Sequence, residues 1–376
     1  MNIDPLILSL LEKPSVSPND AGCQSLLADA LSAIGFTVET LNKGDVSNLW
    51  AKKSGLEPTT LLFAGHTDVV PVGDSNDWCS DPFMPTIRGG YLYARGAADM
   101  KVALACMVLA CRDFLRDYPQ HKNSIAFLLT SAEEVTTCDG TKYAIDVIQA
   151  RQTEQIRWCI VGEPSSGERL GDQIKVGRRG SLSGRLTILG KQGHIAYPHL
   201  AVNPIHLGMG ALHELANTVW DEGNAYFSPT SLQVSNIHAG VGATNVIPAS
   251  LQVDFNIRYS TKVTAETLQK GVHAILDAYG FAYELAWSHG GNPFLSLTGA
   301  LVAAVDHATQ LVVGCVPIHS TTGGTSDARF IAPYGIQTVE LGFCHTTIHQ
   351  TNECILVDDI AKLRRIYYHV MRMLLL

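Results

Sequence analysis

Side chains that bind metal ions recur in this sequence, several of them at the ends of apolar, strand-like runs. His66 and Asp68 follow the run Thr60–Ala64, within the motif Gly-His-Thr-Asp. Further histidine and carboxylate side chains stand in later segments: Asp99, Glu133, Glu134, Glu163 and His349. Neutral imidazole with several carboxylates, and without cysteine, is the ligand chemistry of a hydrolytic zinc site. The number of carboxylates favours two metal ions over one.

The position of these residues relative to the predicted strands supports a shared site. In open α/β sheets, ligands bind outside the carboxyl ends of the strands. His66, the pair Glu133–Glu134 and Glu163 come directly after such ends, and Asp99 stands where a loop enters a helix. A single histidine after a strand is more often structural. Several such residues in one topological position favour a metal centre.

Two acidic positions suggest roles beside direct metal binding. Asp68 is either an ordinary turn residue or the acceptor of the second ring N–H of His66, which would fix the tautomer of the imidazole. Glu133 and Glu134 are adjacent, so their side chains diverge in an extended segment. One of them can bind metal while the other serves as general base and then as acid to a leaving amine. The alternative is a pair of exposed loop acids.

Polar residues of later segments suit a substrate that carries carboxylate groups. His194 stands in a tight loop, where a lone histidine is more often structural. The segment Gly242–Pro248 and Arg258 offer groups that can bind carboxylates. Arg178 stands at an expected domain junction, as either a solvated hinge residue or a bidentate clamp for an acidic substrate. The turn Gly323–Asp327 is either a nest of backbone N–H groups for a carboxylate or a simple turn.

The elements that must position these residues alternate between helix and strand in the first part of the chain. Apolar spacing predicts helices over 5–11, 21–34 and 100–115, and strands over 35–39, 61–64, 124–129 and 157–161. Asp99 is expected to cap the helix over 100–115, because aspartate is a favoured N-cap residue. Alternating strands and helices predict an α/β sheet covered on both faces.

The pattern changes near Gly180. Strands are predicted over 181–189, 230–237, 250–258 and 281–287, with helices over 203–219 and 265–279. This order, strand-helix-strand-strand-helix-strand, is typical of a ferredoxin-like sandwich. The α/β pattern then resumes with a helix over 297–312, a strand over 337–341 and a final helix from Val357. We therefore expect one domain from 1–178 and 293–376, with a second domain, 179–292, inserted into it.

Composition narrows the classes of protein. A chain of 376 residues exceeds one typical core, which agrees with two domains. Its net charge of −8 argues against a nucleic-acid-binding protein, and no apolar run is long enough to span a bilayer. The first residues lack the basic region and cleavage site of a signal peptide. Nine scattered cysteines without a Cys-x-x-Cys motif favour a reducing, cytoplasmic setting.

Taken together, these residues resemble the di-zinc aminoacylase and carboxypeptidase family. The resemblance rests on the Gly-His-Thr-Asp strand and on four further segments: 95–101, 176–184, 193–200 and 321–327. It covers nearly the whole chain. It implies an α/β, zinc-exopeptidase-like catalytic domain with a central mixed sheet, and an inserted ferredoxin-like α+β domain that makes a homodimer.

The resemblance also implies a role for each candidate residue. Asp99 would bridge two Zn²⁺ ions, which Co²⁺ can replace; His66 and Glu163 would complete one site, and Glu134 and His349 the other. Glu133 would be the general base, and Asp68 would assist catalysis by fixing the tautomer of His66. His194 would polarise the scissile carbonyl and stabilise its oxyanion in the partner subunit's site. The substrate contacts would be Arg178, Ser181, Tyr197, Asn245, Arg258, Gly324, Thr325 and His345. At His345 the family usually has asparagine.

The resemblance further implies the function: zinc-dependent hydrolysis of N-succinyl-LL-2,6-diaminopimelate, a small dicarboxylic amino-acid substrate, in lysine and meso-diaminopimelate biosynthesis. One alternative is a related deacylase such as an N-acetylornithine deacetylase. Arg178 and Arg258 favour the first reading, because a dicarboxylic acyl group needs additional cationic contacts. The other alternative is a non-catalytic, metal-dependent binding protein. Glu133 argues against it, since a binding protein needs no base beside its metal ions.

Overall fold

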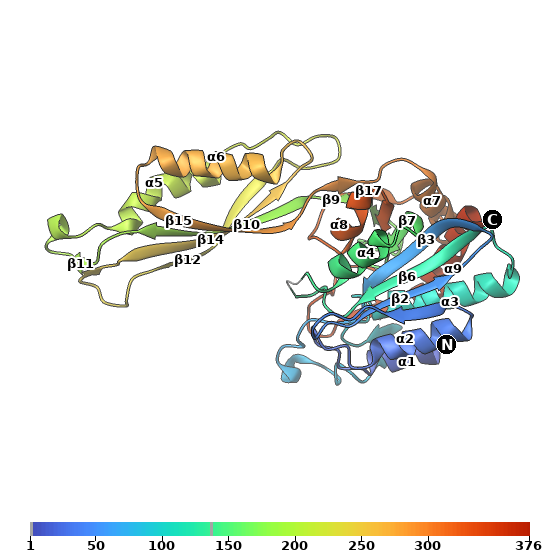
Figure 1. Cartoon of the computed structure of the whole chain (residues 1–376). Coiled ribbons are helices and arrows are strands. Elements are labelled where there is room, and N and C mark those ends of the chain that lie inside the picture. Colours follow the sequence, from blue (N-terminus) through green and yellow to red (C-terminus); the bar gives the residue numbers. More distant parts are fainter. Residues whose placement is uncertain (1–2, 136–137) are drawn as a thin grey trace. The chain divides into compact units, whose positions relative to one another are not determined.

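The computed structural model describes residues 3–135 and 138–376, and Figure 1 shows its elements. The chain forms two compact units. The first consists of Met1–Gly177, Leu295–Ser320 and Ser326–Leu376, and the second of Arg178–Phe294 with the short segment Thr321–Thr325. The chain therefore leaves the first unit once near Gly177 and briefly again at Thr321. No helix among the described residues is long and apolar enough to cross a bilayer.

A mixed eight-stranded sheet forms the centre of the first unit. In spatial order its strands are β1 (Thr37–Thr40), β2 (Asn48–Lys53), β6 (Asn123–Thr130), β3 (Glu57–His66), β7 (Gln155–Val161), β18 (Gln337–Glu340), β8 (Gln173–Lys175) and β17 (Ile318–Ser320). The pairs β6–β3, β3–β7 and β7–β18 are parallel, whereas β1–β2 and β2–β6 are antiparallel. Strands β6, β3 and β7 each contain a continuous apolar run, as expected for strands buried on both faces, whereas the short strand β18 has only one apolar residue.

Helices cover both faces of this sheet (Figure 1). They are α1 (Pro5–Leu11), α2 (Cys23–Ala33), α3 (Lys101–Asp117), α4 (Thr141–Ala150), α7 (Ala300–Val313), α8 (Ala328–Ile331) and α9 (Val357–Leu375). Phe63 on β3 packs against Phe127 on β6 and against Tyr367 on α9, with ring centroids 5.3 and 5.8 Å apart. Alternate residues of the strands thus form the core under α2, α3 and α9, and α4 and α8 cover the other face.

The second unit is an antiparallel sheet with two helices on one face. Its strand order is β12 (Ser231–Ala239), β14 (Ser250–Tyr259), β10 (Gly180–Leu189) and β15 (Tyr283–Gly291). Buried residues alternate along β14, from Leu251 to Tyr259, and pack with α5 (Pro204–Asn217) and α6 (Ala265–Ala278). The predicted order, strand-helix-strand-strand-helix-strand, is confirmed. Pro204 occupies the first turn of α5, and Asn203 caps it by accepting a hydrogen bond from the N–H of Ile205.

Several short elements were not predicted, because each has too few residues to show a hydrophobic period. They are β4 (Thr86–Arg88), β5 (Tyr91–Tyr93), β9 (Gly177–Arg178), β11 (Gly193–His194), β13 (Val246–Ile247), β16 (Phe294–Leu295), β19 (Cys354–Leu356) and the 3-10 turns η1 (Ser75–Asp77), η2 (Pro198–Leu200) and η3 (Ala332–Tyr334). One prediction was wrong: Asp99 does not cap α3. The cap position is Met100, which makes no side-chain capping bond, and the Asp99 carboxylate lies against His66 instead.

Candidate metal centre

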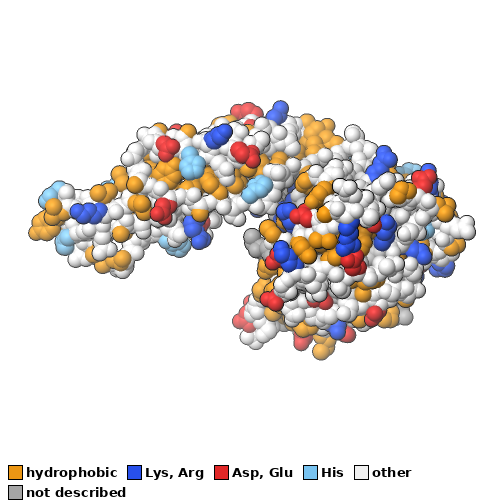
Figure 2. All heavy atoms as spheres, viewed as in Figure 1, with side chains coloured by type: hydrophobic (Ala, Val, Ile, Leu, Met, Phe, Trp, Pro, Cys, Tyr) orange, Lys and Arg blue, Asp and Glu red, His pale blue; other side chains and the backbone are white. Residues whose placement is uncertain are grey.

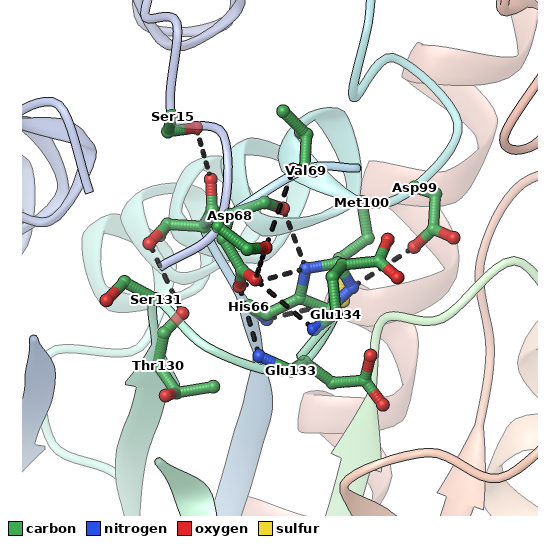
Figure 3. A network of polar contacts seen from close by, with 12 residues as sticks. Ser15, His66, Asp68, Val69, Asp99, Met100, Thr130, Ser131, Glu133 and Glu134 are labelled. Atoms are coloured by element: carbon green, nitrogen blue, oxygen red, sulfur yellow. Dashed lines mark hydrogen bonds and ion pairs between the residues drawn. The ribbon is translucent and has the colours of Figure 1, made fainter. Parts of the chain in front are cut away.

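The strand order of the first unit brings the predicted ligands together. Strand β3 lies between β6 and β7, and its last residue, His66, pairs with Thr130 at the end of β6. Because these strands are parallel, the segments that follow them emerge at the same edge of the sheet. The pair Glu133–Glu134 follows β6, and Glu163 follows β7. Figure 3 shows His66, Asp99 and the two glutamates around one point at this edge.

Asp99 lies between the two imidazoles. Its Oδ1 is 3.1 Å from Nε2 of His66, and its Oδ2 is 3.4 Å from Nε2 of His349. Each imidazole also contacts a second carboxylate: Glu163 Oε1 is 3.6 Å from His66 Nε2, and Glu134 Oε1 is 3.1 Å from His349 Nε2. One carboxylate therefore faces two histidines with different oxygen atoms, which is the arrangement that a bridging ligand needs.

The donor set and its spacing fit divalent metal ions. Two ligand atoms bound tetrahedrally to one zinc ion, each at about 2.1 Å, lie about 3.4 Å apart. The four imidazole–carboxylate distances are all close to this value. Two groups of ligand atoms also lie within 4.8 Å of one another: His66, Glu133 and Glu163, and His66, Asp99 and Glu134. Glu133, which we expected to act as the base, therefore lies as close to His66 and Glu163 as a metal ligand would.

Without metal ions, two carboxylates of this centre, Glu133 and Glu163, bind protons more readily than ordinary glutamates. Burial raises the pKa of Glu133 to about 8, and the neighbouring carboxylate of Asp327 adds to this effect. Burial likewise raises the pKa of Glu163 well above its ordinary value, with a further contribution from Asp99. Several buried carboxylates at one point repel one another, so the site favours cations or protons. This electrostatic pattern is typical of a functional centre.

His66 and His349 hold protons because neighbouring carboxylates stabilise the charged imidazolium, whereas the two glutamates hold protons because burial disfavours their charge. Burial opposes the charge on His66, but hydrogen bonds with Asp68 and Asp99 outweigh it and raise its pKa well above the ordinary value. Hydrogen bonds with Asp99 and Glu134 raise the pKa of His349 to about 10. A metal ion binds only the neutral imidazole, so metal loading must displace these protons.

Asp68 makes contacts that differ in part from those expected. The nearest partner of His66 Nδ1 is the backbone carbonyl of Asp68, at 2.9 Å, and the Asp68 carboxylate is farther away, at 3.5 Å. That carboxylate accepts hydrogen bonds from the backbone N–H groups of Glu133 and Glu134, both at 3.2 Å, and from the hydroxyl of Ser17. Asp68 therefore positions the segment that carries both glutamates as well as the imidazole.

The predicted residues of the 193–200 loop and of the 242–248 segment lie on the surface of the second unit. His194 on β11 and Asn245 beside β13 are exposed, and β11 pairs with β13. The rings of His194 and Tyr197 are 5.7 Å apart, and Nδ1 of His194 accepts a hydrogen bond from the N–H of Ala196. The N–H of Ile195 donates to the carbonyl of Asn245. The loop is thus ordered by its own contacts and presents His194 outward.

The remaining predicted substrate contacts divide between the units. Arg178 is buried, and its Nη1 donates to the carbonyl of Thr322 at 2.6 Å, within the segment Thr321–Thr325 that also contains Gly324 and Thr325. Ser181 pairs with Arg258 across β10 and β14. In the first unit, His345 is exposed and its N–H donates to the carbonyl of Ser166. The role of the 323–327 turn as a carboxylate nest remains a prediction.

Two neighbours of Glu133 were not predicted as part of the site. Arg329 Nη1 is 4.0 Å from Glu133 Oε1, and the Asp327 carboxylate raises the pKa of Glu133. Asp327 is itself held by the hydroxyl of Thr141, at 2.6 Å. The position of Asp327 in the Gly-Gly-Thr-Ser-Asp turn was the one sequence signal that could have assigned it to the site. The other missed residues are Arg95 and Glu353, a buried ion pair at 2.9 Å.

Comparison with known proteins agrees with this architecture. The family model "Peptidase family M20/M25/M40" matches residues 62–373. Proteins named succinyl-diaminopimelate desuccinylase from Acinetobacter baylyi and Thioalkalivibrio sulfidiphilus are both 54% identical to this chain, over 98% of each sequence. The fold also matches a tripeptidase structure from Staphylococcus aureus, with a TM-score of 0.79, 20% identity and coverage of 98% and 96%.

A second solved structure shares the fold. It is a dinuclear metal binding peptidase of the M20 family from Bacillus subtilis, with a TM-score of 0.72, 15% identity and coverage of 98% of this chain and 96% of that one. The predicted fold class, an α/β domain with a central mixed sheet and an α+β insertion, is confirmed, and so is the predicted family. The chain belongs to peptidase family M20/M25/M40.

Proposed function

We propose that this chain is a metal-dependent amidohydrolase that hydrolyses N-succinyl-LL-2,6-diaminopimelate to succinate and LL-2,6-diaminopimelate. The reaction belongs to the biosynthesis of lysine and meso-diaminopimelate. The observation that carries the chemistry is the position of Asp99 between two imidazoles, with Glu133 beside the same cluster. The substrate is supported by identities of 54% to two proteins named succinyl-diaminopimelate desuccinylase, over nearly their whole length.

The proposed cofactor is a pair of zinc ions. His66 and Glu163 would hold one ion, Glu134 and His349 the other, and Asp99 both, which agrees with the contacts of 3.1 to 3.6 Å among these side chains. When bound, such ions lower the pKa of water and polarise an amide carbonyl. Asp68 holds the backbone of Glu133 and Glu134 and so keeps both glutamates at the centre.

Glu133 is the proposed general base. Its carboxylate takes a proton from the attacking water and then delivers it to the nitrogen of the leaving amine. A pKa of about 8 in the metal-free chain supports this role, because a carboxylate with such a pKa can hold a proton near neutral pH. The pKa of about 8 already includes the lowering effect of Arg329, 4.0 Å away, and cations in the centre would lower it further and leave Glu133 ionised at the start of the reaction.

The second unit is the proposed dimerisation domain. Its edge strand β12 is paired on one side only, and apolar side chains such as Ile195, Leu200 and Met209 are exposed. An exposed edge and apolar surface of this kind are commonly covered in a two-fold dimer. We place His194 and Asn245 in the active site of the partner subunit, where His194 would stabilise the oxyanion. The nine free cysteines suit a reducing, cytoplasmic environment.

Release of succinate is the direct test. The protein is stripped of metal with a chelator, reloaded with zinc, and supplied with N-succinyl-LL-2,6-diaminopimelate or N-acetylornithine. We expect zinc-dependent release of succinate and little release of acetate. Preferential release of acetate would identify a related deacylase, and metal binding without turnover of either compound would identify a binding protein.

A further inference from the structure

Glu353 is a buried carboxylate in the first unit, and all its hydrogen-bond donors belong to the segment that ends at Asp99. It is 1% exposed. Its Oε1 accepts from the backbone N–H groups of Ala98 and Asp99, at 2.7 and 3.0 Å. Its Oε2 accepts from the N–H of Gly96, at 3.0 Å, and from Nη1 of Arg95, at 2.9 Å. The conformation of the Asp99 segment therefore depends on a residue 254 positions later in the chain.

Arg95 extends this link to the segment that carries His349. Its Nη1 also donates to the carbonyl of Gln350, the residue after His349, at 3.1 Å. Its Nη2 donates to the carbonyl of Pro71 at 3.3 Å, and its guanidinium lies 5.2 Å from the ring centroid of Trp78. Arg95 and Glu353 thus tie two loops together, and each loop carries one side of the contact between Asp99 and His349.

The His349 loop needs such support because its backbone is unusual. His349 and Asn352 both have a φ of 60°, in the left-handed region that residues other than glycine seldom adopt. Such conformations persist only where surrounding contacts hold them. Asn352 supplies one set of contacts, by accepting from the N–H of Cys79 and donating to the carbonyl of Asp77. The Arg95–Glu353 pair supplies the set that faces Asp99.

We infer that Glu353, together with Arg95, is a positioning residue that sets the distance between Asp99 and His349 and thereby the affinity for the metal ion that these two share. The inference rests on the proposed metal centre. A ligand constellation must be held within about 0.5 Å of its productive geometry. His66 lies on the central strand β3 and does not depend on the 349–353 loop. Loss of Glu353 should therefore weaken one ion more than the other.

The test is a zinc titration of the metal-free Glu353→Gln variant in competition with a chromophoric chelator. The amide keeps one acceptor oxygen but turns an NH₂ group toward two of the four donors. We expect the affinity for one of the two ions to fall about 10- to 100-fold, the usual effect of removing a partner that orients metal ligands. The affinity for the other ion should change only a few-fold. Excess zinc should restore much of the turnover. Glu353→Asp, which keeps the charge, should give an intermediate loss.

A matched control is Asp221→Asn in the second unit. Asp221 is also a carboxylate that orders loops, since it accepts from the N–H groups of Gly223 and Thr230 and from the hydroxyls of Thr230 and Ser260. No proposed ligand lies in that unit. The control should lower the melting temperature and leave both zinc affinities unchanged.

The inference is overturned if Glu353→Gln binds both ions as tightly as the wild type, or if both affinities fall equally. If that variant does not fold, Arg95→Lys replaces it, because lysine keeps the charge but cannot reach Glu353, Gln350 and Pro71 together. The same selective loss of zinc affinity is expected for Arg95→Lys. Unchanged zinc affinities in that variant would overturn the inference. A wild-type protein that binds fewer than two ions would refute the proposed metal centre instead.

Discussion

The two units place their candidate functional residues in opposite settings. In the first unit, His66 at the end of the parallel strand β3 and Asp99 in the loop before α3 are buried and lie in contact. In the second unit, His194 and Asn245 are exposed on the short β11–β13 ribbon. Figure 2 shows pale blue histidine and orange apolar side chains on the surface of the second unit around β11. The first unit thus buries its candidate residues in contact with one another, whereas the second unit presents its candidate residues to solvent.

This difference in burial follows from the loops and turns that carry the candidate residues at the edge of each sheet. Neighbouring parallel strands deliver their carboxyl-terminal loops to one edge, so the side chains that follow them meet without further assembly. Burying the resulting charges is costly unless they pair with one another or with cations. An antiparallel ribbon at a domain tip brings few residues together and leaves them in water. The residues of the first unit should therefore determine metal binding and chemistry, and those of the second unit should act only after assembly.

The largest expected effect is that of Glu133→Gln. The variant keeps the size of the side chain but removes the base, so turnover should fall by about two to four orders of magnitude. Metal content and melting temperature should remain near those of the wild type. Glu134→Gln is the matched neighbour and should lose metal as well as activity. Near-normal turnover of a fully loaded Glu133→Gln enzyme would remove Glu133 from the role of base.

The next prediction tests whether the residues of the second unit act in the partner subunit. Inactive His194→Ala and inactive Glu133→Gln subunits are mixed and allowed to exchange. If His194 acts across the dimer, each mixed dimer has one site with both lesions and one intact site. Random mixing should then restore about a quarter of the wild-type activity.

The formation of mixed dimers is checked independently, with one subunit tagged and the other recovered by affinity capture. Mixed dimers that form and stay inactive would show that His194 serves its own subunit or has no part in catalysis. Failure to form any dimer would refute the proposed assembly.

A smaller effect is expected for Arg178→Ala. Removing a buried, charge-assisted contact to a substrate carboxylate should cost about 2–3 kcal/mol in transition-state binding, measured through kcat/KM. The loss should be greater for succinylated than for acetylated substrates. Arg179→Ala, at the adjacent position, is the control. Because Arg178 also donates to the carbonyl of Thr322, an equal loss on both substrates would show that its role is structural.

The smallest effect concerns pH. In the metal-free protein the pKa of His349 is raised from 6.5 to about 10, so its proton stabilises the fold fully below pH 6.5, and this stabilisation is lost as the pH rises toward 10. The raised pKa of His66 acts in the same direction. Zinc needs both imidazoles neutral, so a fixed zinc concentration should raise the melting temperature more at about pH 8 than at about pH 6.

His319→Gln is the control for this measurement. His319 is also paired with a carboxylate, that of Asp306, at 2.8 Å, but it lies outside the metal centre. Its replacement should leave the pH dependence of the zinc effect unchanged. A zinc effect that is equal at both pH values would contradict the proton displacement expected at His66 and His349.

The sequence alone was enough to predict the order of the main elements and the positions of the candidate ligands relative to the strands. His66, the Glu133–Glu134 pair and Glu163 could be assigned to strand ends because an apolar run and the polar residue after it are adjacent in the chain. The strand-helix order of the second unit follows from hydrophobic periods of two and of 3.6, which are also local. Residue type and spacing carry such information without any knowledge of the tertiary contacts.

Only the tertiary structure decided which distant residues meet. The position of β3 between β6 and β7 turns three separate strand ends into one edge, and hydrophobic spacing does not encode this order. The same holds for the turn of Asp99 away from its helix toward His66, and for the link from Glu353 to Asp99 across 254 residues. Such contacts depend on how whole layers pack, because a buried carboxylate can take its partners from any segment that the packing brings within hydrogen-bonding distance.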